Sequence, residues 1–297
     1  MNTNSTIRAR RIADDIDALA GITEPDRPYT RRAFTPKFLE GRKWLEQAMR
    51  DAGAVTQIDA AGNLIGTIPG AHPDLGTIML GSHSDTVPDG GRFDGIAGVI
   101  AALEVVRALR DQGTVLDHTL EVADFLAEEV SIFGVSCIGS RGMTGSRPPE
   151  WLQRVAGGLT LKQAIADVGG HPLHSAERDD IKAFLELHIE QGPVLQNEKI
   201  DIGVVTAIAG ITRIEIIVEG RADHAGTTPM GARADHRSLD RIGCRGTRQG
   251  AGQWRSPFRR DGRRIRNDPQ RGQCRARQGA HADRCACRTA RGYGALR

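Results

Sequence analysis

The chain of 297 residues is 39% apolar and 26% charged, as expected of a folded, globular protein. Its net charge of +3 averages two unlike parts: residues 236–297 carry 17 arginines against four aspartates, and residues 1–235 carry a net charge of −10. An acidic body argues against nucleic acid as the partner, and no apolar run is long enough to span a membrane. The N-terminus has no signal-peptide pattern and the body holds one cysteine, Cys137, which predicts a cytoplasmic protein.

Two helices are predicted before residue 55. Residues 1–22 have the apolar spacing of an amphipathic helix, with one face formed by Ile7, Ile12, Ile16 and Leu19. Thr35 and Pro36 have the pattern of an N-cap followed by proline in the first turn. A second helix is therefore predicted from Pro36 to about Gly53.

Strands and helices alternate along the rest of the acidic body. A helix that is apolar on nearly all sides is predicted at 96–113, ending at Gly113. Strands are predicted at 55–58, 63–68, 77–83, 119–129 and 182–190, and as a pair around Gly210 within 200–220. This order predicts an α/β fold with a mixed, mostly parallel central sheet flanked by helices.

The segment GSHSDTVPDGGRFDG, residues 81–95, gathers a histidine, three aspartates and four glycines after an apolar run. His83 and Asp85 lie two positions apart, so both side chains are predicted on one side of the strand end. That placement suits a metal-binding imidazole whose other ring nitrogen is held by a carboxylate. Asp94 follows Gly90–Gly91 and precedes the helix, so the glycines would let its loop approach an ion. Each aspartate alone fits an ordinary loop or helix cap equally well; together they indicate a site.

Two glutamates and a histidine lie at or near the ends of two later predicted strands. Glu128 and Glu129 are predicted to point to opposite sides, so one can bind a metal while its neighbour acts as a general base. A pair of surface glutamates is the plain alternative. His188 lies in an apolar strand, where a single histidine is more often a packing residue than a ligand. If the strands end at one edge of a parallel sheet, His83, Asp94, Glu129 and His188 form a ligand set for Zn²⁺ or Mn²⁺.

Other polar residues are weaker candidates. His224, in ADHAGTTPM, fits either an oxyanion or substrate contact or a simple turn, and Gln191 fits either a substrate-facing loop or a turn. Cys137 is predicted to be a packing residue, because nothing nearby in the sequence would lower its pKa. No serine-nucleophile elbow and no nucleotide-binding motif is found.

Four motifs, GSHSDTVPDGGRFDG, FLAEE, ELHIEQGP and ADHAGTTPM, occur in an order and spacing that resembles the dinuclear metal amidohydrolases. That family includes N-carbamoyl-L-amino-acid hydrolases, allantoate amidohydrolases and β-ureidopropionases, and it is related to the metallo-aminopeptidases. The resemblance covers roughly residues 5–235. It implies hydrolysis of a linear amide C–N bond in a small ureido or carbamoyl acid, two divalent metal ions with zinc before manganese, cobalt or nickel, and a homodimer.

The resemblance also implies metal-binding roles. His83 and His188 would hold one metal ion, Asp94 would bridge both ions, and Glu129 would bind the second. Asp85 would orient His83.

Three residues would act on the substrate. Glu128 would be the general base that takes a proton from the attacking water and passes it to the leaving amine. Gln191 would contact the substrate near the metal ions. His224 would polarise the scissile carbonyl in the site of a neighbouring subunit.

The sequence departs from the family pattern after Asp235. Residues 1–210 would form an incomplete catalytic domain and 211–235 the start of a lid and dimerisation domain. Residues 236–297 lack valine, methionine and glutamate, and are predicted to be out-of-frame sequence that is disordered. A form without the rest of the lid is predicted to hold at most one metal ion well and to have negligible turnover.

Two alternatives remain open at this point. A metallo-dipeptidase or an aminoacylase would use the same metal site, because the lid decides between these substrates. The arginine-rich residues 236–297 would alternatively form a nucleic-acid-binding arm, although they contain no lysine and few aromatic residues.

Overall fold

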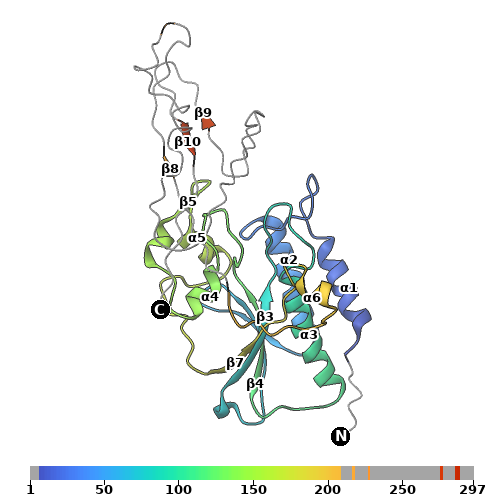
Figure 1. Ribbon diagram of the computed structural model, residues 1–297. Coiled ribbons are helices and arrows are strands. Elements are labelled where there is room, and N and C mark those ends of the chain that lie inside the picture. Colours follow the sequence, from blue (N-terminus) through green and yellow to red (C-terminus); the bar gives the residue numbers. More distant parts are fainter. Residues whose placement is uncertain (1–6, 209–215, 218–226, 228–274, 277–284, 288–297) are drawn as a thin grey trace. The chain divides into compact units, whose positions relative to one another are not determined.

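The computed structural model describes residues 7–208, 216–217, 227, 275–276 and 285–287, and the chain divides into two units, Met1–Asp201 and Ile202–Arg297 (Figure 1). The helices of the first unit are α1 (Ala9–Ala20), α2 (Pro36–Asp51), α3 (Ile96–Asp111), α4 (Ile138–Met143), α5 (Leu161–Asp167) and α6 (Val194–Glu198), with 3₁₀ helices η1 (Pro73–Leu75) and η2 (Pro149–Gln153). Its strands are β1 (Val55–Ile58), β2 (Leu64–Ile68), β3 (Thr77–His83), β4 (Thr119–Phe125), β5 (Val155–Ala156), β6 (Leu159–Thr160) and β7 (Ile181–Leu185). None of the helices in these ranges is long and apolar enough to cross a membrane.

The central sheet has five strands in the order β1-β2-β4-β3-β7. Strand β3 lies between β4 and β7 and runs parallel to both, from Thr77 opposite Thr119 to His83 opposite Phe125 on the β4 side. Strand β2 runs antiparallel to β4 and to β1. The predicted mixed sheet is confirmed, with its parallel part confined to β4, β3 and β7.

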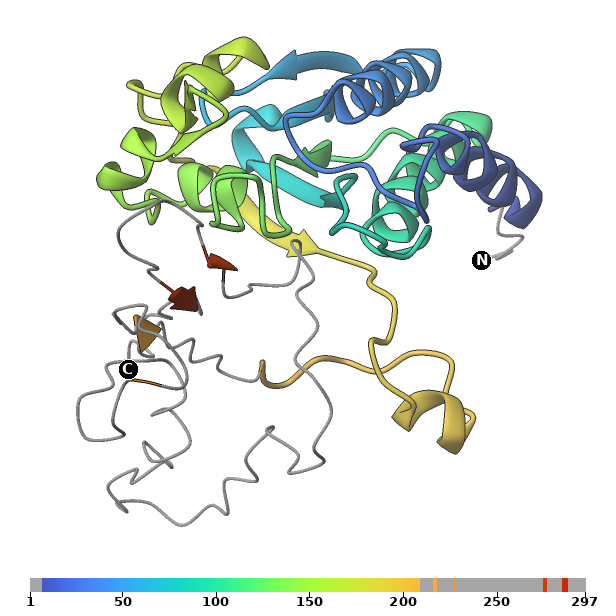
Figure 2. The ribbon, with the colours of Figure 1, turned by 90° about the horizontal axis from the view of Figure 1, so that it is seen from above.

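Helices α2 and α3 pack on one face of the sheet and α1 packs on α3, as Figures 1 and 2 show. The core between them is aliphatic, and its fully buried members include Leu45, Met49, Leu64, Ile100 and Leu103. Side chains alternate along β3, so Ile78 and Leu80 join this core while Met79 packs on the opposite face. The alternation continues to Ser82 and His83, which therefore leave the strand on opposite faces.

The predicted helix signals of α2 and α3 are confirmed, whereas α1 begins only at Ala9. Thr35 is the N-cap of α2, and its hydroxyl accepts a hydrogen bond from the Phe38 amide at 3.3 Å. In α1, Ile16 and Leu19 are buried, whereas Ile7 precedes the helix and is 45% exposed. Gly113 follows α3 with a φ of +63°, a conformation that glycine adopts without strain.

A buried ion pair joins α2 to the sheet. Arg42 Nε lies 2.9 Å from Asp124 Oδ2, and a second guanidinium nitrogen donates to the Asp124 carbonyl at 2.7 Å. The hydroxyl of Ser84, in the loop after β3, donates to the same carboxylate oxygen at 3.0 Å. A buried charge is tolerated when it is paired and hydrogen-bonded, as Oδ2 of Asp124 is here; its Oδ1 accepts no hydrogen bond from the described residues. The loop after β3 is therefore held by a charge pair at the centre of the sheet.

Two strands end earlier than predicted. Strand β4 ends at Phe125 rather than at Glu129, since β3 pairs no further and Ala127 turns the chain with a φ of +50°. Strand β7 ends at Leu185, where its pairing with β3 stops, so His188 lies beyond the strand and not inside it.

The second unit also differs from the prediction. Residues 202–208 are exposed and form no strand, so this part of the predicted pair around Gly210 is wrong. Strand β8 (Ile216–Ile217) instead pairs antiparallel with β10 (Cys285–Cys287), which pairs with β9 (Arg275–Ala276). Apart from β9 and β10, residues 236–297, which are predicted to be disordered, lie outside the described residues.

Replacing Asp180 with asparagine is expected to lower the free energy of unfolding at neutral pH and to matter less in acid. Hydrogen bonds from Arg178 and from Thr77 hold the pKa of Asp180 well below its usual range. An unfolded aspartate titrates near pH ~3.9, so the stabilisation is present above that pH and is lost as the pH falls through the folded pKa. Asp180 is 41% exposed, so solvent screening limits the effect to roughly 0.5–1 kcal/mol. Urea unfolding of both proteins at pH 7 and pH 3 measures it, and an unchanged difference contradicts the assignment.

Candidate metal centre

The candidate site lies where the three parallel strands of the sheet end. His83 is the last residue of β3, Glu128 and Glu129 follow β4 by three and four residues, and His188 follows β7 by three residues. Parallel strands present their carboxyl ends at one edge of a sheet, which is where α/β proteins commonly bind ligands. Asp94 reaches this edge from the loop that precedes α3.

His83 is buried and fixed by the chain that follows it. Its Nδ1 lies 2.9 Å from the carbonyl oxygen of Asp85, and since a carbonyl only accepts, Nδ1 carries the proton. The Asp85 carboxylate, predicted to orient His83, is farther away at 3.6 Å. It instead accepts the backbone amides of Glu128 and Glu129, at 3.1 and 3.2 Å. Asp85 thus ties the β4 loop to the β3 loop, and Nε2 of His83 faces the site.

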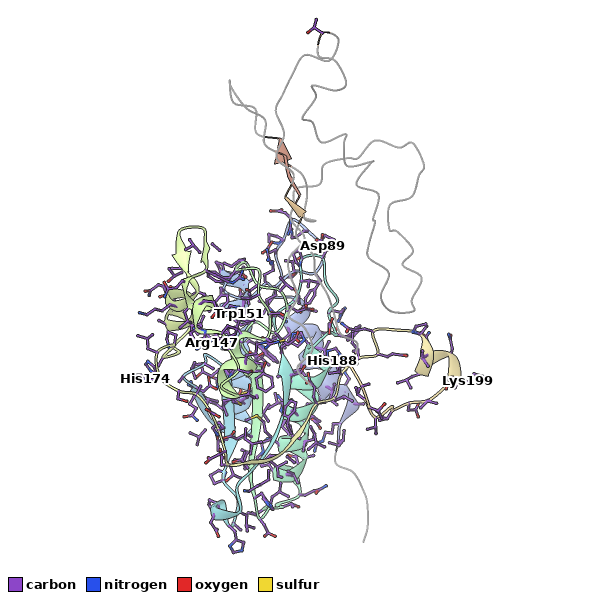
Figure 3. All side chains as sticks on the ribbon, turned by 60° about the vertical axis from the view of Figure 1, so that its left-hand side comes forward. Asp89, Arg147, Trp151, His174, His188 and Lys199 are labelled. Atoms are coloured by element: carbon purple, nitrogen blue, oxygen red, sulfur yellow. The ribbon has the colours of Figure 1, made fainter. Side chains whose placement is uncertain are left out.

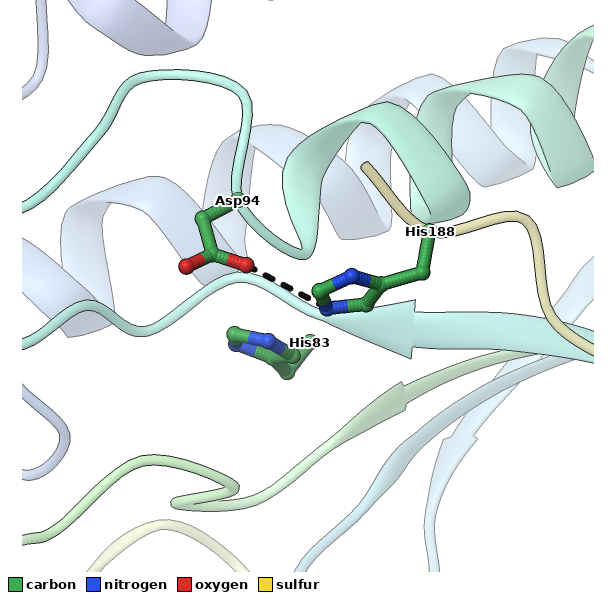
Figure 4. A group of neighbouring side chains, drawn as sticks. All are labelled: His83, Asp94 and His188. Carbon is green, nitrogen blue, oxygen red and sulfur yellow. Dashed lines mark ion pairs between the residues drawn. The ribbon is translucent and has the colours of Figure 1, made fainter. Parts of the chain in front are cut away.

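His83, Asp94 and His188 form a compact group, with one possible ligand atom from each within 4.8 Å of the others (Figure 4). His188 Nε2 lies 3.2 Å from Asp94 Oδ1, and the two imidazole centres are 6.2 Å apart. The Nδ1 of His188 lies 3.0 Å from the Ile189 carbonyl, so this ring also turns Nε2 towards Asp94. His188 is reachable from solvent, with 34% of its side chain exposed.

The bonding of Asp94 fits a cation. Oδ2 accepts a hydrogen bond from the Gln191 amide at 2.9 Å, which brings this predicted substrate residue to the group. Oδ1 is buried and lies 3.2 Å from His188 Nε2, but it accepts no hydrogen bond from the residues that the structure describes. A buried carboxylate oxygen is costly without a partner, and a cation between it and two imidazole nitrogens would supply one. Two nitrogens and one oxygen suit Zn²⁺ and related divalent ions.

Gly95 allows the imidazole of His83 to lie against the start of α3. Its φ is +67°, and a β-carbon at this position would lie 2.6 Å from two ring carbons of His83. Of the two glycines predicted to let the loop approach an ion, a β-carbon on Gly90 would lie 3.0 Å from the Val87 carbonyl oxygen, and one on Gly91 would meet nothing within 4 Å. Neither lies against His83. The close approach is therefore made at Gly95.

Glu128 and Glu129 lie beside the group in different surroundings. Glu128 Oε2 is 3.5 Å from His83 Nε2, and its side chain is 40% exposed. Glu129 is more buried; burial first, and then the charge of Glu128, raise its pKa to about 6. Glu129 is not one of the three residues that form the compact group. Burial works against a charged His83, but hydrogen bonding and charge from Asp85, with the charge of Glu128, outweigh it and raise the pKa of His83 to about 10.

Cys137 contacts the predicted base, which the sequence did not indicate. Its sulfur lies 3.5 Å from Glu128 Oε1. Burial, followed by the charge of Glu128, raises the pKa of the thiol to about 11, which disfavours the thiolate form. The two residues are nine positions apart in an irregular loop, where no periodicity signals proximity. His224 lies outside the described residues.

The fold and the site define an α/β protein with a candidate metal centre at the carboxyl edge of a mixed sheet. Residues 79–287 match the profile of Peptidase family M20/M25/M40. Since this match covers more than half of the chain, the chain belongs to that family. The resemblance seen in the sequence is confirmed at this level.

Individual relatives are similar over the same large share of the chain. An N-carbamoyl-L-amino-acid amidohydrolase of Paenarthrobacter aurescens is 40% identical over 77% of this chain and 57% of its own length. An allantoate amidohydrolase of Bacillus subtilis is 37% identical over 75% of this chain and 56% of its own length. Among solved structures, a hydantoinase/carbamoylase family amidase from Burkholderia ambifaria matches with a TM-score of 0.64 and 38% identity, over 80% of this chain and 58% of its own. The chain thus spans about half the length of the curated relatives that it matches.

Replacing Gly95 with alanine is expected to destabilise the protein by roughly 1–3 kcal/mol, because alanine is strained at this φ and would displace the His83 ring. Zinc binding should weaken in the same variant. Gly91→Ala is the matched control, since it adds the same methyl group in open space and should change stability by less than about 1 kcal/mol. Denaturant unfolding and zinc titration measure both; equal effects of the two substitutions contradict the role of Gly95.

Proposed function

We propose that this chain carries the catalytic site of a metal-dependent amidohydrolase acting on a linear amide C–N bond of an N-carbamoyl amino acid or an allantoate-like ureido acid. The observation that carries the proposal is the convergence of His83, Asp94 and His188 at the carboxyl edge of the sheet. The relatives named as N-carbamoyl-L-amino-acid and allantoate amidohydrolases support the substrate class.

His83, Asp94 and His188 would hold one divalent metal ion, with zinc as the foremost candidate. Glu129, which follows β4 at the same edge of the sheet, would bind a second ion. When bound, a divalent ion would polarise the substrate carbonyl and make a water molecule more acidic.

The chain's own residues supply the proton transfers. Water attacks the carbamoyl or ureido carbon, and the bond from that carbon to the amine nitrogen breaks. The surroundings of Glu128 support this role, since its carboxylate lies 3.5 Å from His83 Nε2 and is 40% exposed to solvent. It takes a proton from the attacking water and transfers it to the leaving nitrogen. Cys137, at 3.5 Å, contacts the other oxygen of Glu128 and limits the positions of the carboxylate.

Gln191 and His224 are the proposed substrate contacts. Gln191 already reaches the site through its bond to Asp94 and would be free to turn towards a substrate. The substrate contact by His224 stays a prediction. So do the homodimer, the cytoplasmic location and the negligible turnover of this chain. The second candidate is a dipeptidase or aminoacylase activity, which is favoured because the chain belongs to a peptidase family.

Replacing His188 with alanine is expected to weaken zinc binding by more than about 100-fold, because it removes one of three converging ligands, a larger loss than that of a supporting contact. Isothermal titration of metal-depleted protein with Zn²⁺ measures the affinity. His174→Ala removes an exposed histidine elsewhere and should leave it unchanged (Figure 3). Equal affinity of the His188→Ala and wild-type proteins contradicts the proposed site.

Replacing Glu128 with glutamine is expected to reduce kcat by about 10²- to 10⁴-fold and to retain zinc binding, because the amide cannot accept the proton. Each candidate substrate is assayed by its own product. The assays measure the free amino acid from N-carbamoyl amino acids, ammonia from allantoate, and amino acids from dipeptides and N-acyl amino acids. The exposed Glu150→Gln serves as the control. Negligible turnover is predicted for this chain, so the wild-type rate is first compared with that of a chelated sample. A metal-dependent rate is required for the Glu128→Gln comparison; equal rates agree with the predicted negligible turnover and contradict a catalytic role for this chain.

A further inference from the structure

The segment that carries His188 leaves the sheet before it reaches the metal group. The pairing of β7 with β3 stops at Leu185, opposite Leu80, and Glu186, Leu187 and His188 follow without strand partners. An unpaired segment at a sheet edge samples many positions unless side chains hold it. A metal ligand in such a segment requires other contacts to keep its imidazole in place.

One such contact is a hydrogen bond from β3. The hydroxyl of Ser82 donates to Glu186 Oε1 at 2.6 Å. Ser82 is 1% exposed, so the bond is shielded from water at one end. A hydrogen bond to a carboxylate is among the stronger ones in proteins. The bond joins Ser82, the residue before His83, to Glu186, which is two residues before His188.

A second contact packs the same segment closely against α3. A β-carbon on Gly98 would clash with the Leu187 carbonyl oxygen and would lie 2.7 Å from the Ser82 β-carbon. The absence of a side chain at Gly98 therefore lets α3, β3 and the segment after β7 meet at one point. Ser82 and Leu187 lie side by side on this glycine.

We propose that Ser82 and Glu186 are positioning residues that hold His188 over Asp94, in the cradle left open by Gly98. The inference rests on the proposed metal site. Glu186 is not one of the converging ligands, and its Oε1 is occupied by the serine hydroxyl, so it acts through the chain and not on the metal. Loss of the bond leaves His83 in its own loop contact with the Asp85 carbonyl and frees only the His188 side of the group.

Zinc affinity of substituted proteins tests the proposal. Ser82→Ala and Glu186→Ala are expected to weaken binding by about 10- to 100-fold, the range seen when a contact that orients a metal ligand is removed. Glu186→Gln keeps an acceptor oxygen for Ser82 and should retain most of the affinity. Thr77→Val is the matched control, because Thr77 donates to Asp180 at 2.7 Å at the opposite end of the same strand. It should alter stability and leave zinc affinity unchanged.

A double-substitution cycle separates positioning from general damage. In a His188→Ala background, Ser82→Ala should have no further effect on the remaining zinc affinity, because the residue that it positions is gone. An equal loss in both backgrounds overturns the proposal, as does a loss of affinity with Thr77→Val that matches the loss with Ser82→Ala.

A measurement without metal keeps this inference distinct from the proposed function. In histidine-labelled, metal-free protein, the ring signal of His188, assigned with His188→Ala, should move in Ser82→Ala and Glu186→Ala and stay in place in Thr77→Val. A His188 signal that does not move overturns the positioning role. Wild-type protein that binds no zinc overturns the proposed metal site, and the ring signal still decides whether Ser82 and Glu186 hold His188.

Discussion

The parallel pairing of β3 with β4 on one side and β7 on the other is the constraint on which the site depends. Because the three strands run in one direction, their carboxyl ends bring His83, Glu128 and His188 to the same edge from positions 45 and 60 residues apart along the chain. The antiparallel strands β1 and β2 widen the sheet without adding ligands. Asp94 comes from the start of α3, which packs on β3 and β4. Any change of register between β3 and its neighbours would separate these groups.

Polar contacts inside the protein hold the loop that contains His83 and Asp85. Ser84 donates to the Asp124 carboxylate, which is paired with Arg42, and Thr86 exchanges hydrogen bonds with the backbone of Arg31. Buried polar groups of this kind stabilise little in net terms, but the bonds that they make favour one arrangement of the loop. The loop is therefore more rigid than its irregular backbone suggests, and a rigid loop suits a histidine that must present one nitrogen.

Patterns of neighbouring residues predicted the elements and, through the shared edge of parallel strands, the convergence of His83, Asp94 and His188; the exact strand ends and individual hydrogen bonds were not predictable. Alternating apolar residues placed β3 and its terminal His83, and Thr35–Pro36 marked the start of α2. The ends of β4 and β7 were missed, because a strand ends where its partner ends and not where apolar residues stop. The bond from His83 to the Asp85 carbonyl was also missed, since spacing alone does not separate a main-chain acceptor from a side-chain one.

Strand β7 has consequences for how the protein behaves in concentrated solution. Among the strands that the structure describes, it has a neighbour on one side only, and Phe184 and Leu185 are about half exposed. Free amide and carbonyl groups on an edge strand attract other strands, and exposed apolar side chains strengthen that attraction. Lys182 is the charged residue of this strand, and its charge opposes the approach of a second copy. Added salt screens that charge, so self-association along this edge should increase with ionic strength.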